Sequence, residues 1–198
     1  MRSKSVTYTA TVFMRGMKVT VPSANWRLQE DMPGELNLAA PPGGDKATLI
    51  KFFLDPIPTA PGGVILTKVG RTPAALVAWL RQNANFVVSA PTKKRIAHSL
   101  TATSVKLDVS AKAPKEDPTC TTPCVTYFVF HGPNYDFPYS TAHGFPLRLY
   151  FATLRSGAKT HTFLISVEPP SAAALTTILP VAEKILRSIK LPPKITTG

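Results

Sequence analysis

Apolar and polar residues alternate along much of the chain, and this two-residue period is typical of half-buried β-strands. The period is clearest in residues 104–110 ("SVKLDVS"), whose three apolar residues fall on one side. Segments 7–22 and 147–169 show it as well, and "RSGAK" marks a hairpin turn in the second of them. The pattern predicts a chain rich in strands that are joined by turns.

Two segments replace this alternation with helical spacing. In residues 70–86, Thr72 can cap a helix and Pro73 suits its first position. In residues 171–192, Ser171 can serve as the N-cap, and basic residues near the end complement the helix dipole. Strands, a helix, more strands and a final helix predict an α+β fold, in which a single antiparallel β-sheet has two main helices packed against it.

The 198 residues suit one domain with one hydrophobic core. We expect residues 12–192 to form this single α+β domain. Residues 1–11 are expected to be an N-terminal extension or the first strand, and residues 193–198 a C-terminal tail.

The net charge of +12 favours association with anionic surroundings, such as phospholipid, a polyanionic cell wall or nucleic acid. The basic residues are spread singly, apart from the run at residues 93–95, which reads as a solvated turn. Nucleic-acid binding requires a contiguous basic face, so it is the less favoured interpretation. The expected partner is an unknown protein or an anionic component of the cell envelope. No apolar run is long enough for a transmembrane segment.

Cys120 and Cys124 are the only cysteines, and three residues separate them. A thioredoxin-like centre has two intervening residues, and a zinc site needs about four ligands. A disulfide that closes the "CTTPC" loop is the most economical interpretation, and it favours an extracytoplasmic, secreted or cell-surface location. No leader is recognisable in this chain, so we expect either a cytoplasmic protein or a mature domain that has been cut from its leader. Two free thiols would instead indicate the cytoplasm.

Residues 131–148 ("HGPNYDFPYSTAHGFPLR") combine aromatic, proline and glycine residues, which predicts a long loop. Aromatic faces beside hydrogen-bonding groups are typical of ligand and partner surfaces. The predicted contact residues are His131, Tyr135, Asp136, Tyr139, His143 and Arg148.

Two other interpretations of this segment stay open. Its aromatic residues can simply cover the end of the sheet. Alternatively, His131 or His143 together with Asp136 can form the acid–base pair of a hydrolase or transferase, although no readable motif supplies a nucleophile. Phosphate-binding and metal-binding motifs are missing, so we expect no cofactor and no metal, and we name no catalytic residue.

Three segments together resemble the PsbP-like fold family: the ending "AEKILRSIKLP", the stretch "VTVPSANWRL" and the helix "TPAALVAWL". This family includes a lumenal subunit of photosystem II and actinobacterial secreted lipoproteins. The resemblance implies a non-enzymatic accessory or binding domain on the outer side of a membrane, which acts by surface recognition. The lipobox cysteine of those lipoproteins is not found in this chain.

Overall fold

The computed structural model describes residues 4–41, 47–97, 100–131 and 136–195. Its elements in chain order are β1 (Val6–Thr9), β2 (Lys18–Val21), β3 (Arg27–Met32), β4 (Glu35–Ala39), β5 (Leu49–Leu54), β6 (Ile57–Ala60), the 3-10 turn η2 (Pro61–Gly63), β7 (Val64–Ile65), α1 (Pro73–Gln82), β8 (Phe86–Val88), β9 (Thr92–Ile96), β10 (Leu100–Val109), β11 (Cys124–His131), β12 (Asp136–Ala142), β13 (Leu147–Ser156), β14 (Lys159–Glu168) and α2 (Ala172–Arg187).

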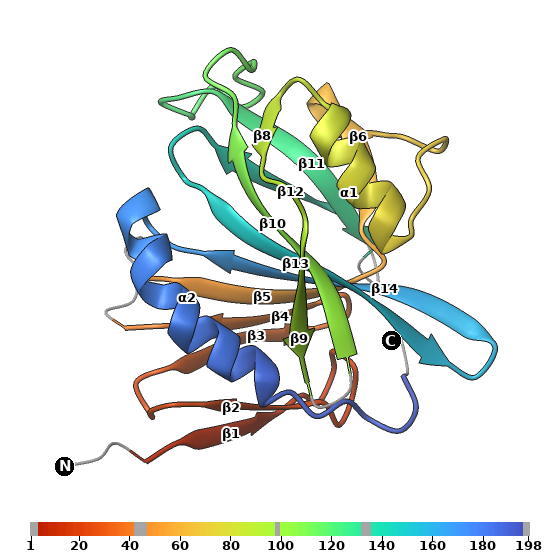
Figure 1. Cartoon of the computed structure of the whole chain (residues 1–198), viewed down its shortest axis with the longest axis vertical. Helices are drawn as coiled ribbons and strands as arrows, with labels where there is room; N and C mark the ends of the chain where they lie inside the picture. Colours follow the sequence, from red (N-terminus) through yellow and green to blue (C-terminus); the bar gives the residue numbers. More distant parts are fainter. Residues whose placement is uncertain (1–3, 42–46, 98–99, 132–135, 196–198) are drawn as a thin grey trace.

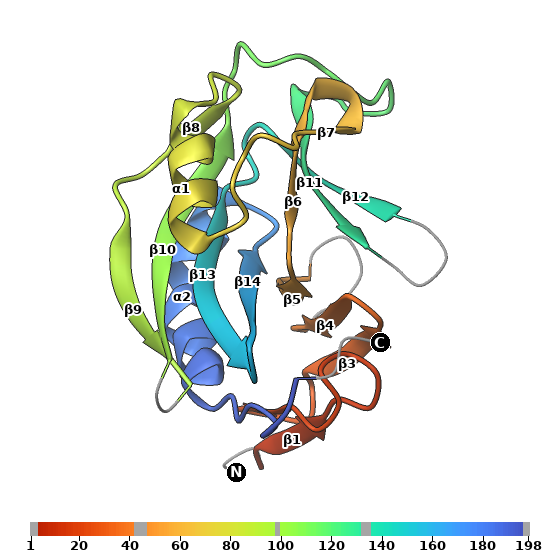
Figure 2. The same ribbon diagram turned by 90° about the vertical axis from the view of Figure 1, so that its right-hand side faces the viewer.

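The strands form three sheets (Figure 1). The largest has eight strands in the order β3-β4-β5-β14-β13-β10-β8, and β9 pairs with β10 beside β8. A second sheet has four strands in the order β12-β11-β6-β7, and β1 pairs with β2 in a separate hairpin. In Figure 2, strands β6, β11 and β12 form a layer of their own alongside β13 and β14.

The predicted single sheet with two helices packed against it is therefore wrong. After β5 the chain leaves the large sheet at Asp55 and continues as β6, which belongs to the four-stranded sheet. The hairpin of β11 and β12 then pairs with β6 and not with the large sheet. Alternation identifies which residues of a strand are buried, but it does not identify the neighbouring strand.

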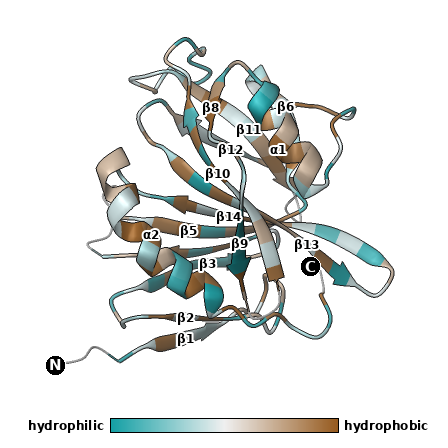
Figure 3. Cartoon of the chain, viewed as in Figure 1, coloured by the Kyte–Doolittle hydropathy of each residue, from teal (hydrophilic) through white to brown (hydrophobic). Residues whose placement is uncertain are grey.

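The two helices lie on different faces of the large sheet. Adjacent residues of a strand point to opposite faces, and Phe52 and Phe53 accordingly enter two different cores. The Phe52 core includes the inner residues of α2 and of β2, whereas the Phe53 core includes α1 and the inner residues of β11. Figure 1 shows β10 and β13 running diagonally between α1 and α2. Figure 3 shows hydrophobic colours along much of central strand β5.

Both helices begin where the sequence predicts. The Thr72 hydroxyl accepts a hydrogen bond from the Ala75 amide, and the Ser171 hydroxyl accepts one from the Ala174 amide. Each cap satisfies an amide that has no partner within the helix. These local signals are sufficient to locate the helices, although the arrangement of the sheets does not follow from them.

The long loop predicted for residues 131–148 is also wrong in part, because β12 occupies residues 136–142. Pro138 lies within this strand, opposite Val129 of β11. β12 is an edge strand, where the missing amide of a proline costs no ladder hydrogen bond. Aromatic side chains on β12 therefore face a partner sheet instead of solvent.

The ends of the described chain pack onto the body. Residues 6–9 form β1, and the Val6 and Tyr8 side chains pack against the Phe52 core. Near the other end, the Ser156 hydroxyl donates to the Ile195 carbonyl and accepts from the Ile195 amide. The outermost residues, 1–3 and 196–198, lie outside the described part of the chain.

Candidate functional site

The strands β4, β5 and β14 carry polar side chains on the face that is turned toward the four-stranded sheet. Lys51 of β5 lies between Asn37 of β4 and Ser166 of β14 in the strand register. Residues directly opposite each other on neighbouring strands point to the same face. Together with two tyrosines from the facing sheet they make up what we call the inter-sheet cluster: Glu35, Asn37, Lys51, Tyr127, Tyr139, Ser166 and Glu168.

Lys51 is the centre of the inter-sheet cluster. Its Nζ lies 3.5 Å from a carboxylate oxygen of Glu168 and 4.0 Å from one of Glu35. The same Nζ lies 5.1 Å from the centroid of the Tyr139 ring, which is within the range of a cation–π contact. Lys51 and Glu168 each keep 18% of their side-chain surface exposed, so solvent reaches the cluster at these two residues.

Several buried polar atoms of the cluster have no hydrogen-bond partner. Eight side-chain atoms of this kind occur in the described part of the chain, and five of them belong to the cluster. They are Asn37 Oδ1, Ser166 Oγ, Glu168 Oε1 and the hydroxyls of Tyr127 and Tyr139. Leaving one such group buried and unpaired costs about 1–3 kcal/mol. Their concentration in one place indicates that bound molecules, either water or ligand, complete the cluster.

Burial changes the protonation of these groups. Desolvation raises the pKa of Glu168 to about 7, because the attraction of Lys51 only partly offsets it and the charge of Glu35 adds to it. Desolvation likewise raises the pKa of Glu35, against the opposing effects of Lys51 and of the hydrogen bond from Asn37. Desolvation and the negative charge of Glu168 raise the pKa of Tyr127 well above its usual value. The cluster thus contains two carboxyl groups that interact with each other and with one ammonium group.

One neighbouring residue adds to this negative charge. The Asn37 amide nitrogen donates to a carboxylate oxygen of Glu30 on β3, which leaves the Asn37 Oδ1 as a free acceptor. Carboxylates accept hydrogen bonds and do not donate them when ionised. The inter-sheet cluster is therefore best suited to groups that donate hydrogen bonds.

Of the six residues predicted for contact, only Tyr139 has a described side chain in this cluster. Tyr139 is buried, and its ring packs against Phe53 and Phe130 as well as under Lys51. Tyr135 lies outside the described residues, and of His131 only the backbone is described.

Asp136, His143 and Arg148 lie apart from the cluster and from one another, although Asp136 lies directly opposite His131 in the β11–β12 ladder. Asp136 and His143 lie at opposite ends of the β11–β12 hairpin, since Asp136 pairs with His131 whereas the His143 amide donates to the Pro123 carbonyl. His143 Nδ1 lies 2.7 Å from the Val109 carbonyl oxygen. Arg148 pairs with Val167, which belongs to the core on the α2 side. The described geometry gives no acid–base pair of His143 with Asp136.

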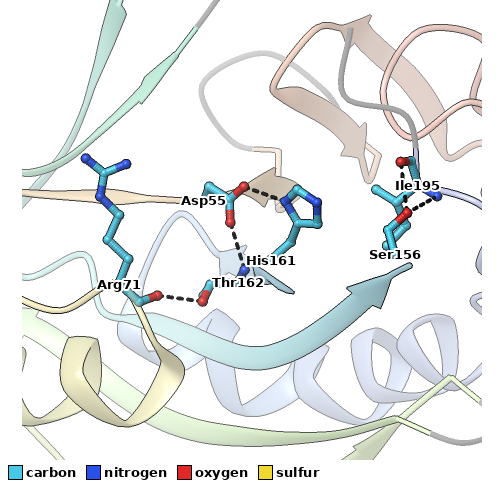
Figure 4. A network of polar contacts seen from close by, with 6 residues as sticks. All are labelled: Asp55, Arg71, Ser156, His161, Thr162 and Ile195. Carbon is cyan, nitrogen blue, oxygen red and sulfur yellow. Dashed lines mark hydrogen bonds and ion pairs between the residues drawn. The ribbon is translucent and has the colours of Figure 1, made fainter. Parts of the chain in front are cut away.

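A different histidine and aspartate do meet (Figure 4). Asp55 Oδ2 lies 2.7 Å from His161 Nδ1, and Asp55 Oδ1 accepts a hydrogen bond from the Thr162 amide. The Thr162 hydroxyl in turn donates to the Arg71 carbonyl oxygen. These residues line a surface pocket of about 540 Å³ beside the start of α1.

The Asp55–His161 pair has a structural explanation. Asp55 has a φ of 51° at the point where the chain passes from the large sheet to β6, and aspartate tolerates this left-handed conformation. Its carboxylate fastens that crossing to β14 through His161 and Thr162. Ser156, also drawn in Figure 4, is bonded to Ile195 instead of His161, and the Arg71 side chain extends away from the pair. The pair therefore has a structural role, which is to hold the link between β5 and β6 against β14.

The disulfide prediction is confirmed, because Cys120 and Cys124 are joined. A disulfide is consistent with an oxidising, extracytoplasmic location. The bond lies beside a surface pocket of about 470 Å³, which also includes Glu116, Thr126 and Ser140. Neither helix of the described part of the chain is long and apolar enough to cross a membrane. The same residues contain no cluster of side chains that could hold a metal ion.

The basic run at residues 93–95 lies on β9 and not in a turn. β9 shows as strongly hydrophilic in Figure 3. Lys94 forms an ion pair with Glu183 of α2 at 2.9 Å, and Lys93 donates to the Thr103 hydroxyl. The basic residues of this run therefore already have partners within the protein.

The sequence contains one signal for the inter-sheet cluster that the search for motifs does not detect. Lys51 stands in the middle of the apolar run "LIKFFL", and Glu168 ends the apolar run of β14. A charged residue inside an otherwise buried strand needs a partner or a function. Which strands supply the partners depends on the sheet order, which the alternation of apolar residues does not determine.

No protein-family model matches the chain, and no curated protein matches it. Among solved structures, the chain is similar to a protein from Bacteroides thetaiotaomicron whose crystal structure was determined at 1.50 Å resolution. The two are 12% identical with a TM-score of 0.44, and the match covers 97% of this chain and 49% of the other. The chain thus spans about half the length of that protein.

Proposed function

We propose that the chain is a non-enzymatic accessory or binding domain of an extracytoplasmic compartment, and that the inter-sheet cluster is its ligand contact. The disulfide supports the compartment, since such bonds persist where thiols are not kept reduced. The resemblance to PsbP-like accessory proteins is a further reason to prefer recognition over catalysis.

The observation that carries this proposal is the set of five unpartnered polar atoms around Lys51. A purely structural core tends to pair its buried polar groups, because each unpaired group costs free energy. A binding site, in contrast, has unpaired groups until its ligand is bound. Here they project between two sheets next to two partly exposed charged residues.

The net charge of +12 supplies a second, less specific contact. A strongly basic domain is attracted to anionic phospholipid or cell-wall polymer, and this attraction weakens as salt is added. We propose that this charge keeps the domain at the envelope surface, while the inter-sheet cluster takes up the ligand.

The test is a fragment titration followed by NMR of backbone amides. Methylammonium, erythritol and acetate are added separately at constant ionic strength, and the amides of Asn37, Lys51 and Ser166 are monitored. We expect at least one of these probes to give saturable shifts at the cluster. The variant Ser166→Val should weaken the binding, because it replaces one polar atom of the cluster with methyl groups.

The matched control is Ser104→Val. The Ser104 hydroxyl is also fully buried, but Ser104 lies opposite Tyr150, whose side chain belongs to the core on the α2 side and is the neighbour of this hydroxyl. This change should leave the titration unaltered. If none of the three probes produces saturable shifts at the cluster in the folded wild-type protein, the cluster is a structural feature and the proposed site is wrong.

A further inference from the structure

We propose that the inter-sheet cluster is selective for a small cationic ligand that carries N–H donors, such as an alkylammonium or guanidinium group. This inference rests on the proposed function, because it names the ligand class of the same site. It adds that the ligand is positively charged, that the ligand donates hydrogen bonds, and that the ligand competes with Lys51.

The local charge of the cluster favours a cation. Glu35 and Glu168 face a single ammonium group, that of Lys51. Glu30 lies on β3, next to β4, and accepts a hydrogen bond from Asn37. The charged groups of the cluster thus include more carboxyls than cations, although the protein as a whole carries +12. An anionic ligand would have to approach these buried carboxylates, and bringing like charges together in a desolvated site is unfavourable.

The unpartnered atoms of the cluster favour a ligand that donates hydrogen bonds. Asn37 Oδ1 and an ionised Glu168 Oε1 only accept hydrogen bonds, and both have no partner among the described residues. The hydroxyls of Ser166, Tyr127 and Tyr139 can also act as acceptors. An ammonium or guanidinium group offers several donors and no acceptor, so it matches this set better than a carboxylate or a phosphate.

Lys51 shows where such a ligand would bind. Its ammonium group already occupies the place that an external cation would take, close to two carboxylates and over the Tyr139 ring. Lysine is flexible and its partly exposed end can move toward solvent. Lys51 is thus a built-in competitor, and replacing it with an uncharged residue should strengthen cation binding.

Binding should also be linked to proton release. A cation placed beside Glu168 favours the ionised carboxylate and lowers its pKa from about 7. The charged and titratable groups that interact with Glu168 are Lys51 from β5, Glu35 from β4 and Tyr127 from the facing sheet. Glu30 acts on Glu35, and Tyr139 lies under Lys51. At neutral pH a part of a proton should leave per cation bound, and above the pKa of Glu168 this release should vanish.

Four probes can be compared on the folded protein by the same amide shifts. Methylammonium and guanidinium should bind, whereas acetate should not. Tetramethylammonium, which has the charge but no N–H donor, should bind at least about tenfold more weakly than methylammonium, which corresponds to about 1.4 kcal/mol. Calorimetry in buffers of different ionisation enthalpy should reveal the proton release.

Two variants make the result specific. Glu168→Gln should weaken methylammonium binding by about tenfold or more and abolish the proton release, whereas Glu183→Gln on α2 should change neither. Lys51→Met should bind methylammonium more tightly than the wild type, and Lys51→Gln serves the same purpose if the first variant does not fold.

The outcomes separate this inference from the proposed function. Binding of erythritol at the cluster without binding of either N–H cation would leave the site in place and overturn the cationic ligand class. Equal affinities for methylammonium and tetramethylammonium would overturn the role of the N–H donors. Absence of saturable shifts with every probe would overturn both.

Discussion

At the scale of single residues, the buried Ser166 and the half-buried Ser188 are in opposite situations. The Ser166 hydroxyl has no partner among the described residues, while the Ser188 hydroxyl donates to backbone carbonyls and accepts from the Thr20 amide. Removing a bonded hydroxyl leaves its partners unsatisfied, but removing an unpaired one relieves a desolvation cost. Comparing the two residues therefore tests directly whether the Ser166 hydroxyl of the cluster lacks a hydrogen-bond partner.

Ser166→Ala should keep the free energy of unfolding unchanged or raise it by up to about 1 kcal/mol, whereas Ser188→Ala should lower it by about 1–3 kcal/mol. Urea denaturation of both variants, without added ligand, measures the difference. A loss of more than about 1 kcal/mol in Ser166→Ala would mean that ordered water already satisfies this hydroxyl tightly.

Whether an interaction between two residues can be predicted from the sequence depends on how close the residues are along the chain. The Cys120–Cys124 bond joins residues that are only four positions apart, so the sequence favours it over two free thiols without any knowledge of the fold. The pairing of Lys51 with Glu35 and Glu168 joins the consecutive strands β4 and β5 to β14, which lies far along the chain. No spacing rule connects such residues before the order of the strands is known.

At the scale of elements, the loop before β2 is fastened to β3 by one carboxylate. Asp31 accepts hydrogen bonds from the amides of Thr11, Val12 and Phe13 and from the Thr11 hydroxyl. Partial burial alone would raise the pKa of Asp31, but these hydrogen bonds outweigh it and keep the pKa below its usual value. The stabilisation is present above the unfolded pKa and is lost as the pH falls through the lower, folded value.

Asp31→Ala should lower the free energy of unfolding by about 1–2 kcal/mol and loosen the segment around residues 11–13. Hydrogen exchange of the Phe13 amide should increase, while exchange in β13 and β14 should not. Asp117→Ala is the matched control, because the Asp117 carboxylate bonds only to Thr119 in an exposed loop. Equal protection of Phe13 in wild type and Asp31→Ala would contradict the fastening.

Elements with strong local signals are predictable from the sequence, and those without them are not. The helix starts at Thr72 and Ser171 and the β13–β14 hairpin follow from capping residues and a turn sequence. β12 is not predictable in this way, because its proline and aromatic composition favours a loop, while its strand conformation comes from pairing with β11. Tertiary pairing here overrides local propensity.

At the scale of the whole molecule, the four-stranded sheet begins where the chain first leaves the large sheet, after β5. The chain changes sheets between β5 and β6, two short apolar strands. Only Asp55 and Pro56 lie between them. This crossing creates the facing surfaces of β5 and of β11–β12, and hence the inter-sheet cluster. The alternation pattern is the same on both sides of the crossing, so the sequence predicts the strands but neither the sheets nor the site between them.

The inter-sheet cluster should also shape how the stability of the whole protein depends on pH. The pKa of Glu168 is about 7 in the folded protein, against 4.5 for an ordinary glutamate. Because the folded state holds this proton more tightly, its contribution to stability is full below the unfolded pKa and is lost as the pH rises through the folded value. A difference of this size corresponds to at most about 3 kcal/mol, and partial solvent exposure reduces it.

Urea denaturation of the ligand-free protein should therefore show stability decreasing as the pH rises from the unfolded pKa of a glutamate toward neutrality. Glu168→Gln, which cannot ionise, should flatten this decrease by about 1–3 kcal/mol. Glu183→Gln should preserve it, because Glu183 lies on α2 and pairs with Lys94 and Arg187 away from the cluster. An identical slope in wild type and Glu168→Gln would show that Glu168 ionises normally, and that bound water or Lys51 compensates its burial in full.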